Sequence, residues 1–200
     1  MKFVDISETD ERTKSEFWEL YESAFPTNER RTTAMFDETL KSPEFCPICI
    51  FDEVGEFCGL FCIWQFEKYV YGEHFATVPE KRNCGLGAEI FAETMKNIVG
   101  ERRFVFEVEK PETPIAARRI EFYKRLGCVM NELYYVQPPY AIDEEPLELR
   151  IMSYPSGLSR AEYGEYLDCV YPRSYALAFR LYDLNIVINR MKKALEGGDR

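Results

Sequence analysis

Two glycines stand where the sequence changes from a strand pattern to a helix pattern, in the stretch Arg82-Asn83-Cys84-Gly85-Leu86-Gly87-Ala88. Residues 69–78 form a β-rich run, and Pro79 closes it because proline cannot donate to a sheet ladder. After the glycines, apolar residues recur near one face of an expected helix over residues 85–99. Glycine lacks a Cβ, so a ligand can approach this backbone closely. The free N–H groups that begin a helix suit a phosphate or pyrophosphate.

Taken alone, the Gly-x-Gly pattern is equally well explained by a tight turn with close packing. It matches neither a Walker loop nor a dinucleotide fingerprint, because it has no Gly-Lys-Ser/Thr and no third glycine. A second pattern follows it: an expected strand over residues 103–109 and then an expected helix over residues 115–126. That helix contains Phe122 and Tyr123 and ends before Gly127.

Together these patterns resemble a known family. Val78-Pro-x-x-Arg82-x-x-Gly85-x-Gly87 resembles motif A of the GNAT acyl-CoA N-acyltransferases, and Phe122-Tyr123-x-x-x-Gly127 resembles their motif B. The resemblance covers most of residues 1–153 and is strongest over 69–127. It implies an α/β fold with a mixed, mainly antiparallel central sheet flanked by helices. Residues 154–200 would then be a C-terminal helical extension packed on that domain.

The resemblance also implies a coenzyme site, with acetyl-CoA as co-substrate and no metal. The loop at residues 82–88 would hold the pyrophosphate of coenzyme A, and the backbone at residues 75–78 would pair with its pantetheine arm as a further strand would. The implied coenzyme-binding residues are Phe75, Ala76, Thr77, Val78, Arg82, Asn83, Cys84, Gly85, Leu86, Gly87, Ala88 and Tyr123.

Two residues are implied to be catalytic. Tyr123 occupies the tyrosine position of motif B, where a phenol can donate a hydrogen bond to the departing thiolate. Glu73 lies on the expected strand shortly before the loop and is the better of several weak candidates for removing the amine proton. Glu107 and Glu109 on the next strand are alternatives, and a solvated carboxylate is as good an explanation for Glu73.

The function implied is N-acetyl transfer from acetyl-CoA to an amine of a small molecule, a peptide or a protein. An alternative from another class is a non-catalytic module that binds acyl-CoA for regulation. Release of the coenzyme thiol across a panel of amines distinguishes them, because the module would bind without turnover.

Composition limits the partners. The chain of 200 residues has 25 basic and 35 acidic residues and a net charge of −10. Nucleic-acid binding requires cationic surface, so this excess argues against it. It favours an amine-bearing acceptor through long-range attraction, although acidity for solubility explains it as well. No apolar run approaches the ~20 residues of a membrane span, and no signal peptide is readable, so we expect no membrane partner and a cytoplasmic location.

Seven cysteines raise the question of zinc. Cys46-x-x-Cys49 followed by Cys58 and Cys62 superficially resembles four zinc ligands. All four fall in expected strands, where alternation would place them on both faces. We therefore interpret them as reduced, mostly buried thiols, with a zinc-bearing interaction domain as a weaker alternative.

The remaining elements follow in order along the chain. We expect strands over residues 2–6, 46–52, 57–66, 128–137 and 147–153, and helices over residues 13–24, 29–40, 159–170 and 174–196. In the family resemblance, Glu29-Arg30-Arg31 and the loop at residues 138–146 are candidates for contact with the acceptor. Alternation places His74 on the opposite face from Glu73, and we interpret it as structural. The leucine-rich spacing of the last helix fits packing on the domain first and a homodimer contact second.

Overall fold

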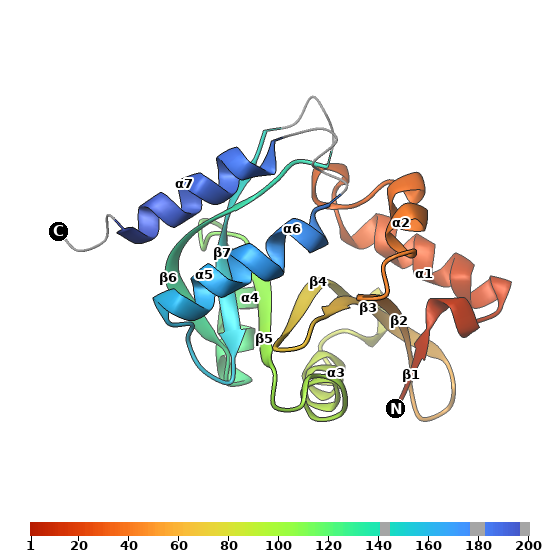
Figure 1. Cartoon of the computed structure of the whole chain (residues 1–200). Coiled ribbons are helices and arrows are strands. Elements are labelled where there is room, and N and C mark those ends of the chain that lie inside the picture. The colour runs from red at the N-terminus through yellow and green to blue at the C-terminus, as the bar shows by residue number, and fades with distance from the viewer. Residues whose placement is uncertain (141–144, 177–182, 197–200) are drawn as a thin grey trace. The chain divides into compact units, whose positions relative to one another are not determined.

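The structure is a computed structural model that describes residues 1–140, 145–176 and 183–196. Contacts divide the chain into two compact units, Met1–Arg102 and Arg103–Arg200. Each unit contributes its own strands and its own helices (Figure 1), and each is described by itself.

The first unit is built on four antiparallel strands in the order β1-β2-β3-β4. Their bounds are Lys2–Asp5, Phe45–Phe51, Phe57–Gln65 and Tyr69–Thr77. Its helices are α1 (Glu11–Ala24), α2 (Thr33–Thr39) and α3 (Leu86–Thr94), and α3 continues as a π-helical turn over Met95–Val99. Helices α1 and α2 lie on one side of this sheet and α3 on the other (Figure 1). The predicted helix over residues 85–99 is therefore confirmed.

Strand β4 has one residue more than its partner at Glu73. Cys62 of β3 lies opposite His74 and Ile63 lies opposite Gly72, so Glu73 has no opposite residue and forms a β-bulge. A bulge interrupts the alternation of side chains. The prediction that His74 points away from Glu73 is therefore wrong, and His74 Nδ1 lies 3.9 Å from Glu73 Oε2.

Helix α2 begins four residues later than the sequence pattern predicts. The chain from Thr27 to Glu29 forms only a 3-10 turn, and Arg30 is extended. Thr32 is the residue that caps α2, because its side chain accepts a hydrogen bond from the N–H of Met35. The predicted start at residue 29 is wrong because Asn28 and Thr32 are both acceptable caps, and only Thr32 is used.

The second unit has three antiparallel strands with β7 in the middle, in the order β5-β7-β6. The strands are β5 (Arg103–Val108), β6 (Val129–Gln137) and β7 (Leu147–Tyr154). The helices are α4 (Pro114–Arg125), α5 (Arg160–Cys169), α6 (Tyr171–Ser174) and α7 (Leu184–Glu196). Helix α4 lies on one side of these strands, and α5 and α6 lie on the other (Figure 1).

The glycine of the second motif ends helix α4. Gly127 has a φ of +87°, which favours glycine. Its N–H donates to the carbonyl of Lys124, and the next N–H, of Cys128, donates to the carbonyl of Tyr123. This pair of bonds is the Schellman motif, and it fixes the last turn of the helix that carries Tyr123.

The C-terminal segment is broken where one long helix was expected. The prediction of a helix over residues 174–196 is wrong, because Tyr175 and Ala176 form a turn. Pro172 opens α6 instead of ending a helix, since proline is tolerated in a first turn. The capping box at Ser159 opens α5 as predicted.

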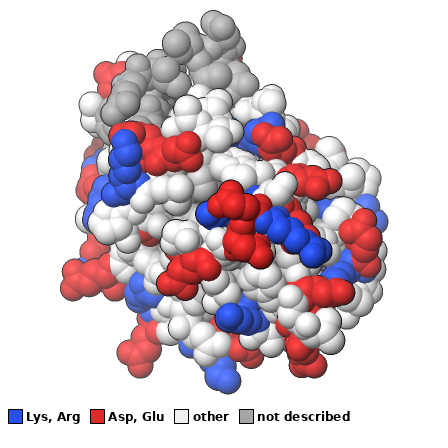
Figure 2. Space-filling model, turned by 90° about the vertical axis from the view of Figure 1, so that its right-hand side faces the viewer, with Lys and Arg blue, Asp and Glu red and all other residues white. Residues whose placement is uncertain are grey.

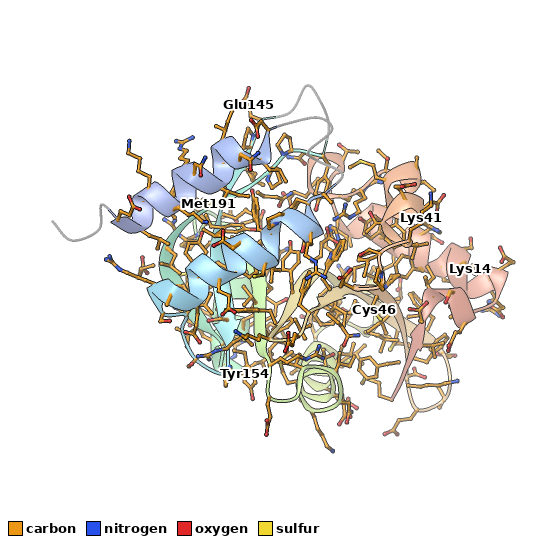
Figure 3. The ribbon with its side chains drawn as sticks, viewed as in Figure 1. Lys14, Lys41, Cys46, Glu145, Tyr154 and Met191 are labelled. Atoms are coloured by element: carbon orange, nitrogen blue, oxygen red, sulfur yellow. The ribbon has the colours of Figure 1, made fainter. Side chains whose placement is uncertain are left out.

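Helix α7 buries one face within its own unit. Leu184, Ile188 and Met191 are buried, and Met191 lies on the side of α7 toward α5 (Figure 3), where the hydroxyl of Tyr163 is 3.6 Å from its sulfur. Part of the leucine-rich face, at residues 177 and 181, lies outside the described residues. Two expectations stay predictions: a homodimer contact made by the last helix, and a domain boundary between residues 153 and 154.

The predicted α/β fold with mainly antiparallel strands is confirmed. The expected parallel pairing of residues 69–78 with 103–109 would join strands of different units, and it stays a prediction. Acidic and basic side chains are interspersed on the face drawn in Figure 2. None of the helices in the described part of the chain is long and apolar enough to cross a membrane.

Candidate functional site

The junction between β4 and α3 presents its backbone to solvent. Gly85 has a φ of +90° and Asn83 a φ of +63°, so two left-handed residues turn the chain into α3. A Cβ on Gly85 would meet no atom within 4 Å, so its conformation, and not space inside the protein, favours glycine here. Asn83, Cys84 and Gly85 are exposed. In the described part of the chain, no hydrogen bond is found from their backbone N–H groups.

Side chains on both sides hold this loop in place. Arg82 donates from Nε to the carbonyl of Thr77 at 3.1 Å. Lys81 pairs with Asp52, and its Nζ lies 2.9 Å from Glu56 Oε2, which ties the loop to the turn between β2 and β3. A fixed loop with outward N–H groups at a helix N-terminus can bind a phosphate-bearing ligand.

Glu73 is buried in an ion pair. Arg31 Nη2 lies 2.6 Å from Glu73 Oε1, and Trp64 Nε1 donates to Glu73 Oε2 at 3.1 Å. The side chains of Arg31 and Glu73 are 1% and 2% exposed. The guanidinium carbon of Arg31 also lies 5.6 Å from the centre of the Trp64 ring. The bulge therefore directs Glu73 toward a buried cation from the segment before α2.

These contacts determine the ionisation of Glu73. Burial raises its pKa, but the charge of Arg31, then that of His74, and the hydrogen bonds from Arg31 and Trp64 outweigh burial and leave the pKa below its usual value. A carboxylate that is held ionised in this way takes up a proton less readily than an ordinary glutamate. The environment favours a positioning role for Glu73 over direct proton transfer.

His74 belongs to the same cluster. Its Nε2 is 2.8 Å from the carbonyl of Glu29, and its ring packs on Tyr21 and Phe25 with centroids 5.0 and 4.6 Å away. Burial lowers its pKa, so the neutral form is favoured. The same tyrosine accepts a hydrogen bond from the backbone N–H of Arg31 at 3.1 Å. His74 thus packs α1 and the segment before α2 against the sheet, as a structural residue would.

Tyr123 lies in the second unit, on the face of α4 that packs on β5. Its ring centre is 4.5 Å from that of Phe106, and the residue is 9% exposed. Burial raises the pKa of its phenol, so the hydroxyl stays protonated and can act as a donor.

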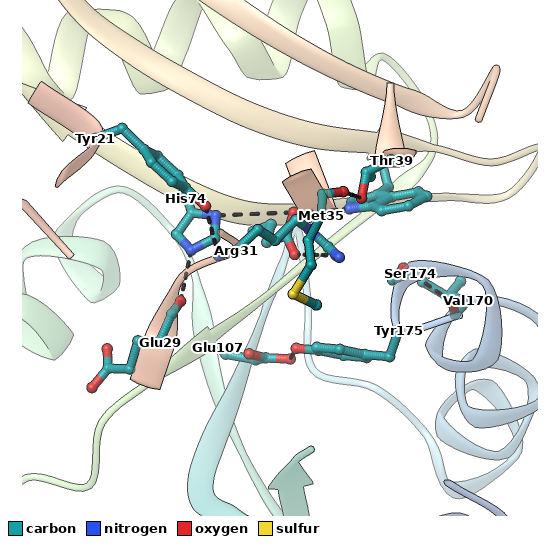
Figure 4. A network of polar contacts seen from close by, with 12 residues as sticks. Tyr21, Glu29, Arg31, Met35, Thr39, His74, Glu107, Val170, Ser174 and Tyr175 are labelled. Carbon is teal, nitrogen blue, oxygen red and sulfur yellow. Dashed lines mark hydrogen bonds and ion pairs between the residues drawn. The ribbon is translucent and has the colours of Figure 1, made fainter. Parts of the chain in front are cut away.

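The two alternative carboxylates on the edge of this unit differ from each other. Glu109 makes an exposed ion pair with Arg119 at 2.8 Å. Glu107 instead accepts hydrogen bonds at one oxygen from the hydroxyls of Tyr135 and Tyr175, the latter at 2.7 Å (Figure 4). Sequence reasoning missed both tyrosines, since no spacing rule links a residue of β6 or of the turn after α6 to β5.

The predicted coenzyme residues at 75–88 and Glu73 lie together in the first unit, along β4 and the start of α3. Tyr123 lies in the second unit, so a site made jointly by these residues stays a proposal. The described residues contain no group of three or more side chains that could hold a metal ion. Burial raises the pKa of Cys49 to about 12 and of Cys58 to about 11, so both favour the thiol form.

Comparisons with known proteins bear on this site. A GNAT-family protein from Bacteroides thetaiotaomicron has a TM-score of 0.76 and 29% identity, over 90% of this chain and 98% of that one. Two others show the fold alone. Phosphinothricin acetyltransferase from Sinorhizobium meliloti, solved with AcCoA, has a TM-score of 0.52 and 16% identity over 78% of this chain and 88% of that one. Spermidine N-acetyltransferase from Vibrio cholerae, solved with CoA and spermine, has a TM-score of 0.56 and 8% identity over 81% and 96%.

No curated protein matches the chain. The profile of the acetyltransferase (GNAT) family matches residues 11–128, which is more than half of the chain and includes both motifs and the cluster around Glu73. The chain therefore belongs to the GNAT family of acetyltransferases.

Proposed function

We propose that this protein transfers an acetyl group from acetyl-CoA to an amine of a small molecule, a peptide or a protein. The observation that carries the proposal is the start of α3, where two left-handed residues, Asn83 and Gly85, present exposed N–H groups at a helix N-terminus. Family membership supports the reaction class, and the relatives solved with AcCoA or CoA support the donor.

The residues that would hold the coenzyme are those of the loop at 82–88, for its pyrophosphate, and the backbone of residues 75–78, for its pantetheine arm. When bound, acetyl-CoA supplies the acetyl group as a thioester that an amine can attack. The net charge of −10 supports a cationic acceptor, because it attracts ammonium groups at long range.

Two side chains are assigned roles in the transfer. Tyr123 is proposed to donate a hydrogen bond from its phenol to the departing thiolate, and burial, which raises the pKa of the phenol, keeps the hydroxyl protonated for this role. Glu73 is proposed to act indirectly, by fixing Arg31 and Trp64 in place.

Thiol release from acetyl-CoA, followed with a thiol reagent, tests the proposal. The panel of acceptors contains spermidine, an aminoglycoside, free amino acids and short peptides with a free N-terminus. We expect at least one amine to raise thiol release well above the rate without amine, with an acetylated product detected by mass. Coenzyme binding without release for any amine would support the non-catalytic module instead.

Calorimetric titration of coenzyme A tests the assigned loop separately. Gly85→Val should weaken coenzyme binding at least tenfold, because it strains the loop and places a side chain where the ligand approaches. Gly55→Val is a matched control: Gly55 also has a positive φ, of +84°, is exposed, and has open space around it. Equal affinities for the two variants would contradict the assignment of the loop.

A further inference from the structure

His74 is buried and uses one of its two ring nitrogens for a hydrogen bond. Nε2 lies 2.8 Å from the carbonyl of Glu29 (Figure 4). A carbonyl only accepts, so Nε2 carries the proton of the neutral ring and Nδ1 is an acceptor. No described residue donates a hydrogen bond to Nδ1. A buried acceptor without a donor is unfavourable, so the ring has one nitrogen at which a second proton would be taken up.

Nδ1 of this ring faces the carboxylate of Glu73. It lies 3.9 Å from Oε2, which is longer than a hydrogen bond. The same oxygen accepts a hydrogen bond from Nε1 of Trp64 at 3.1 Å, whereas Arg31 holds the other oxygen, Oε1, at 2.6 Å. A proton on Nδ1 would turn two neighbouring acceptors into a donor and an acceptor. The imidazole and the indole would then compete for one oxygen of Glu73.

Titratable side chains face His74 from the elements that pack on it in its own unit. They come from β3, β4, α1 and the segment before α2, and they are Cys62, Glu73, Tyr21, Arg30 and Arg31. Burial lowers the pKa of His74, Glu73 and the carbonyl of Glu29 raise it, and the two arginines lower it, which leaves the pKa below 6.5. Burial raises the pKa of Cys62 and of Tyr21, so both stay neutral in acid. Within this set, only His74 changes its charge between about pH 7 and about pH 5.

We propose that His74 is an acid-operated switch that moves Oε2 of Glu73 from the indole of Trp64 to its own ring. Above the transition, Trp64 donates to Oε2. Below it, Nδ1 has taken up a proton from solvent and donates to Oε2, and this hydrogen bond is the stronger one because both partners are charged. Nε2 keeps its hydrogen bond to the carbonyl of Glu29, and Arg31 keeps Oε1. The hydrogen bond from Trp64 is lost.

Release of the indole changes how Arg31 is held. The guanidinium carbon of Arg31 lies 5.6 Å from the centre of the Trp64 ring, so Glu73 fixes the indole and the guanidinium together while His74 is neutral. In acid, two cations share the carboxylate and the indole is free to leave the guanidinium. The inference goes beyond the proposed function, because this response to pH requires neither coenzyme nor amine.

The composition of the chain makes the switch directly observable by NMR. His74 is the single histidine, so ¹⁵N-labelled protein gives one pair of imidazole nitrogen signals, whose positions report tautomer and protonation. The chain has two tryptophans, and Trp18→Phe, at a half-buried position, leaves the indole N–H signal of Trp64 alone. Both signals are followed from about pH 8 to about pH 5. His74→Gln in the same background is the matched control, because its amide can still donate to the carbonyl of Glu29 but takes up no proton.

We expect neutral His74 to be the Nε2–H tautomer and to titrate below pH 6.5. With the same midpoint, the indole signal of Trp64 should move toward the position of a free indole. Its exchange with water should become about tenfold faster than in His74→Gln at the same pH, as loss of a hydrogen bond to a charged group implies. In His74→Gln the indole signal should stay fixed.

An indole signal that does not move while His74 titrates would overturn the proposal, and so would an equal movement in His74→Gln. A neutral His74 with its proton on Nδ1, or one that stays neutral until the protein unfolds, would overturn it as well. If the wild type acetylates no amine, the proposed function fails, and this titration still decides whether the switch exists.

Discussion

Two glutamates, one in each unit, are held in opposite ways. Glu73 is almost completely buried and shares its oxygens between the guanidinium of Arg31 and the indole N–H of Trp64. Glu107 is partly exposed and accepts hydrogen bonds from the neutral hydroxyls of Tyr135 and Tyr175. The first environment places a cation against the carboxylate, and the second places two neutral hydroxyl donors against one carboxylate oxygen.

This difference between the two glutamates separates an effect on the free energy of unfolding from an effect on the rate of acetyl transfer. A buried ion pair contributes little beyond what an apolar pair would, but removing one partner leaves an uncompensated charge. We therefore expect changes at Glu73 to appear mainly in the free energy of unfolding, and Glu107, an alternative candidate for the proton acceptor, is tested by the rate of acetyl transfer.

The largest expected effect follows from removing the cation. Arg31→Met should lower the free energy of unfolding by about 3–5 kcal/mol, because Glu73 would remain buried without its guanidinium. Urea denaturation measures this, and the double variant Arg31→Met/Glu73→Gln should recover part of the loss. A single-variant loss below about 1 kcal/mol would mean that the pair is solvated in the folded protein.

Tyr123→Phe tests the candidate donor to the departing thiolate, which is separate from the two glutamates. We expect kcat to fall about 100-fold, equivalent to ~2.7 kcal/mol of transition-state stabilisation, since the thiolate loses its proton donor. The acid limb of the pH profile of kcat/KM should stay in place, because the phenol is protonated on both sides of it. Phe122→Leu, one residue away, serves as a control, and equal rates for the two variants would remove Tyr123 from the mechanism.

The pH dependence of the free energy of unfolding should report the titration of His74 and Glu73. The folded pKa of His74 is lowered from 6.5, so the unfolded chain binds a proton that the folded chain does not. Stability is complete above pH 6.5 and should fall below it by at most about 1.4 kcal/mol per pH unit. A further loss should follow below pH 4.5 as Glu73, whose pKa is also lowered, becomes protonated.

His74 is the single histidine of the chain, so the slope just below pH 6.5 can be assigned to it. His74→Gln should flatten the free energy of unfolding between pH 6.5 and 5, as measured by urea denaturation at several pH values. A slope that persists in this variant would place its origin outside the cluster.

The smallest effect is expected at Glu109, whose ion pair with Arg119 is about half exposed on both sides. Exposed pairs contribute about 0–1 kcal/mol. Glu109→Gln should change stability by less than about 0.5 kcal/mol and the acetylation rate by less than about twofold. A larger loss of rate would make Glu109, and not Glu107, the better candidate for the proton acceptor.

Much of the fold follows from local patterns. The strands and α3 were predictable because apolar periodicity, Pro79 and the glycines at 85 and 127 act over a few residues. The start of α2 was not, because Asn28 and Thr32 are both good caps and only Thr32 is used. The turn at Tyr175 was not predicted either.

The candidate site was predictable only in part. The coenzyme loop has its own sequence pattern, so residues 82–88 could be named in advance. Arg31 is 42 residues from Glu73 and Tyr175 is 68 residues from Glu107, and no local rule links either pair. The bulge at Glu73 also reverses the face that alternation assigns, which is why His74 was expected on the wrong side.

The measurement that tests the account most directly compares Glu107→Gln with Glu73→Gln in acetyl-CoA-dependent acetylation of one amine between pH 6 and 9. Glu107 is the alternative candidate for the proton acceptor, so we predict that Glu107→Gln lowers kcat/KM about 100-fold or more and removes the acid limb. Glu73→Gln should keep the acid limb at its wild-type pH and lose rate only in proportion to its lost stability. The reverse result, with the acid limb lost in Glu73→Gln and kept in Glu107→Gln, would contradict the account.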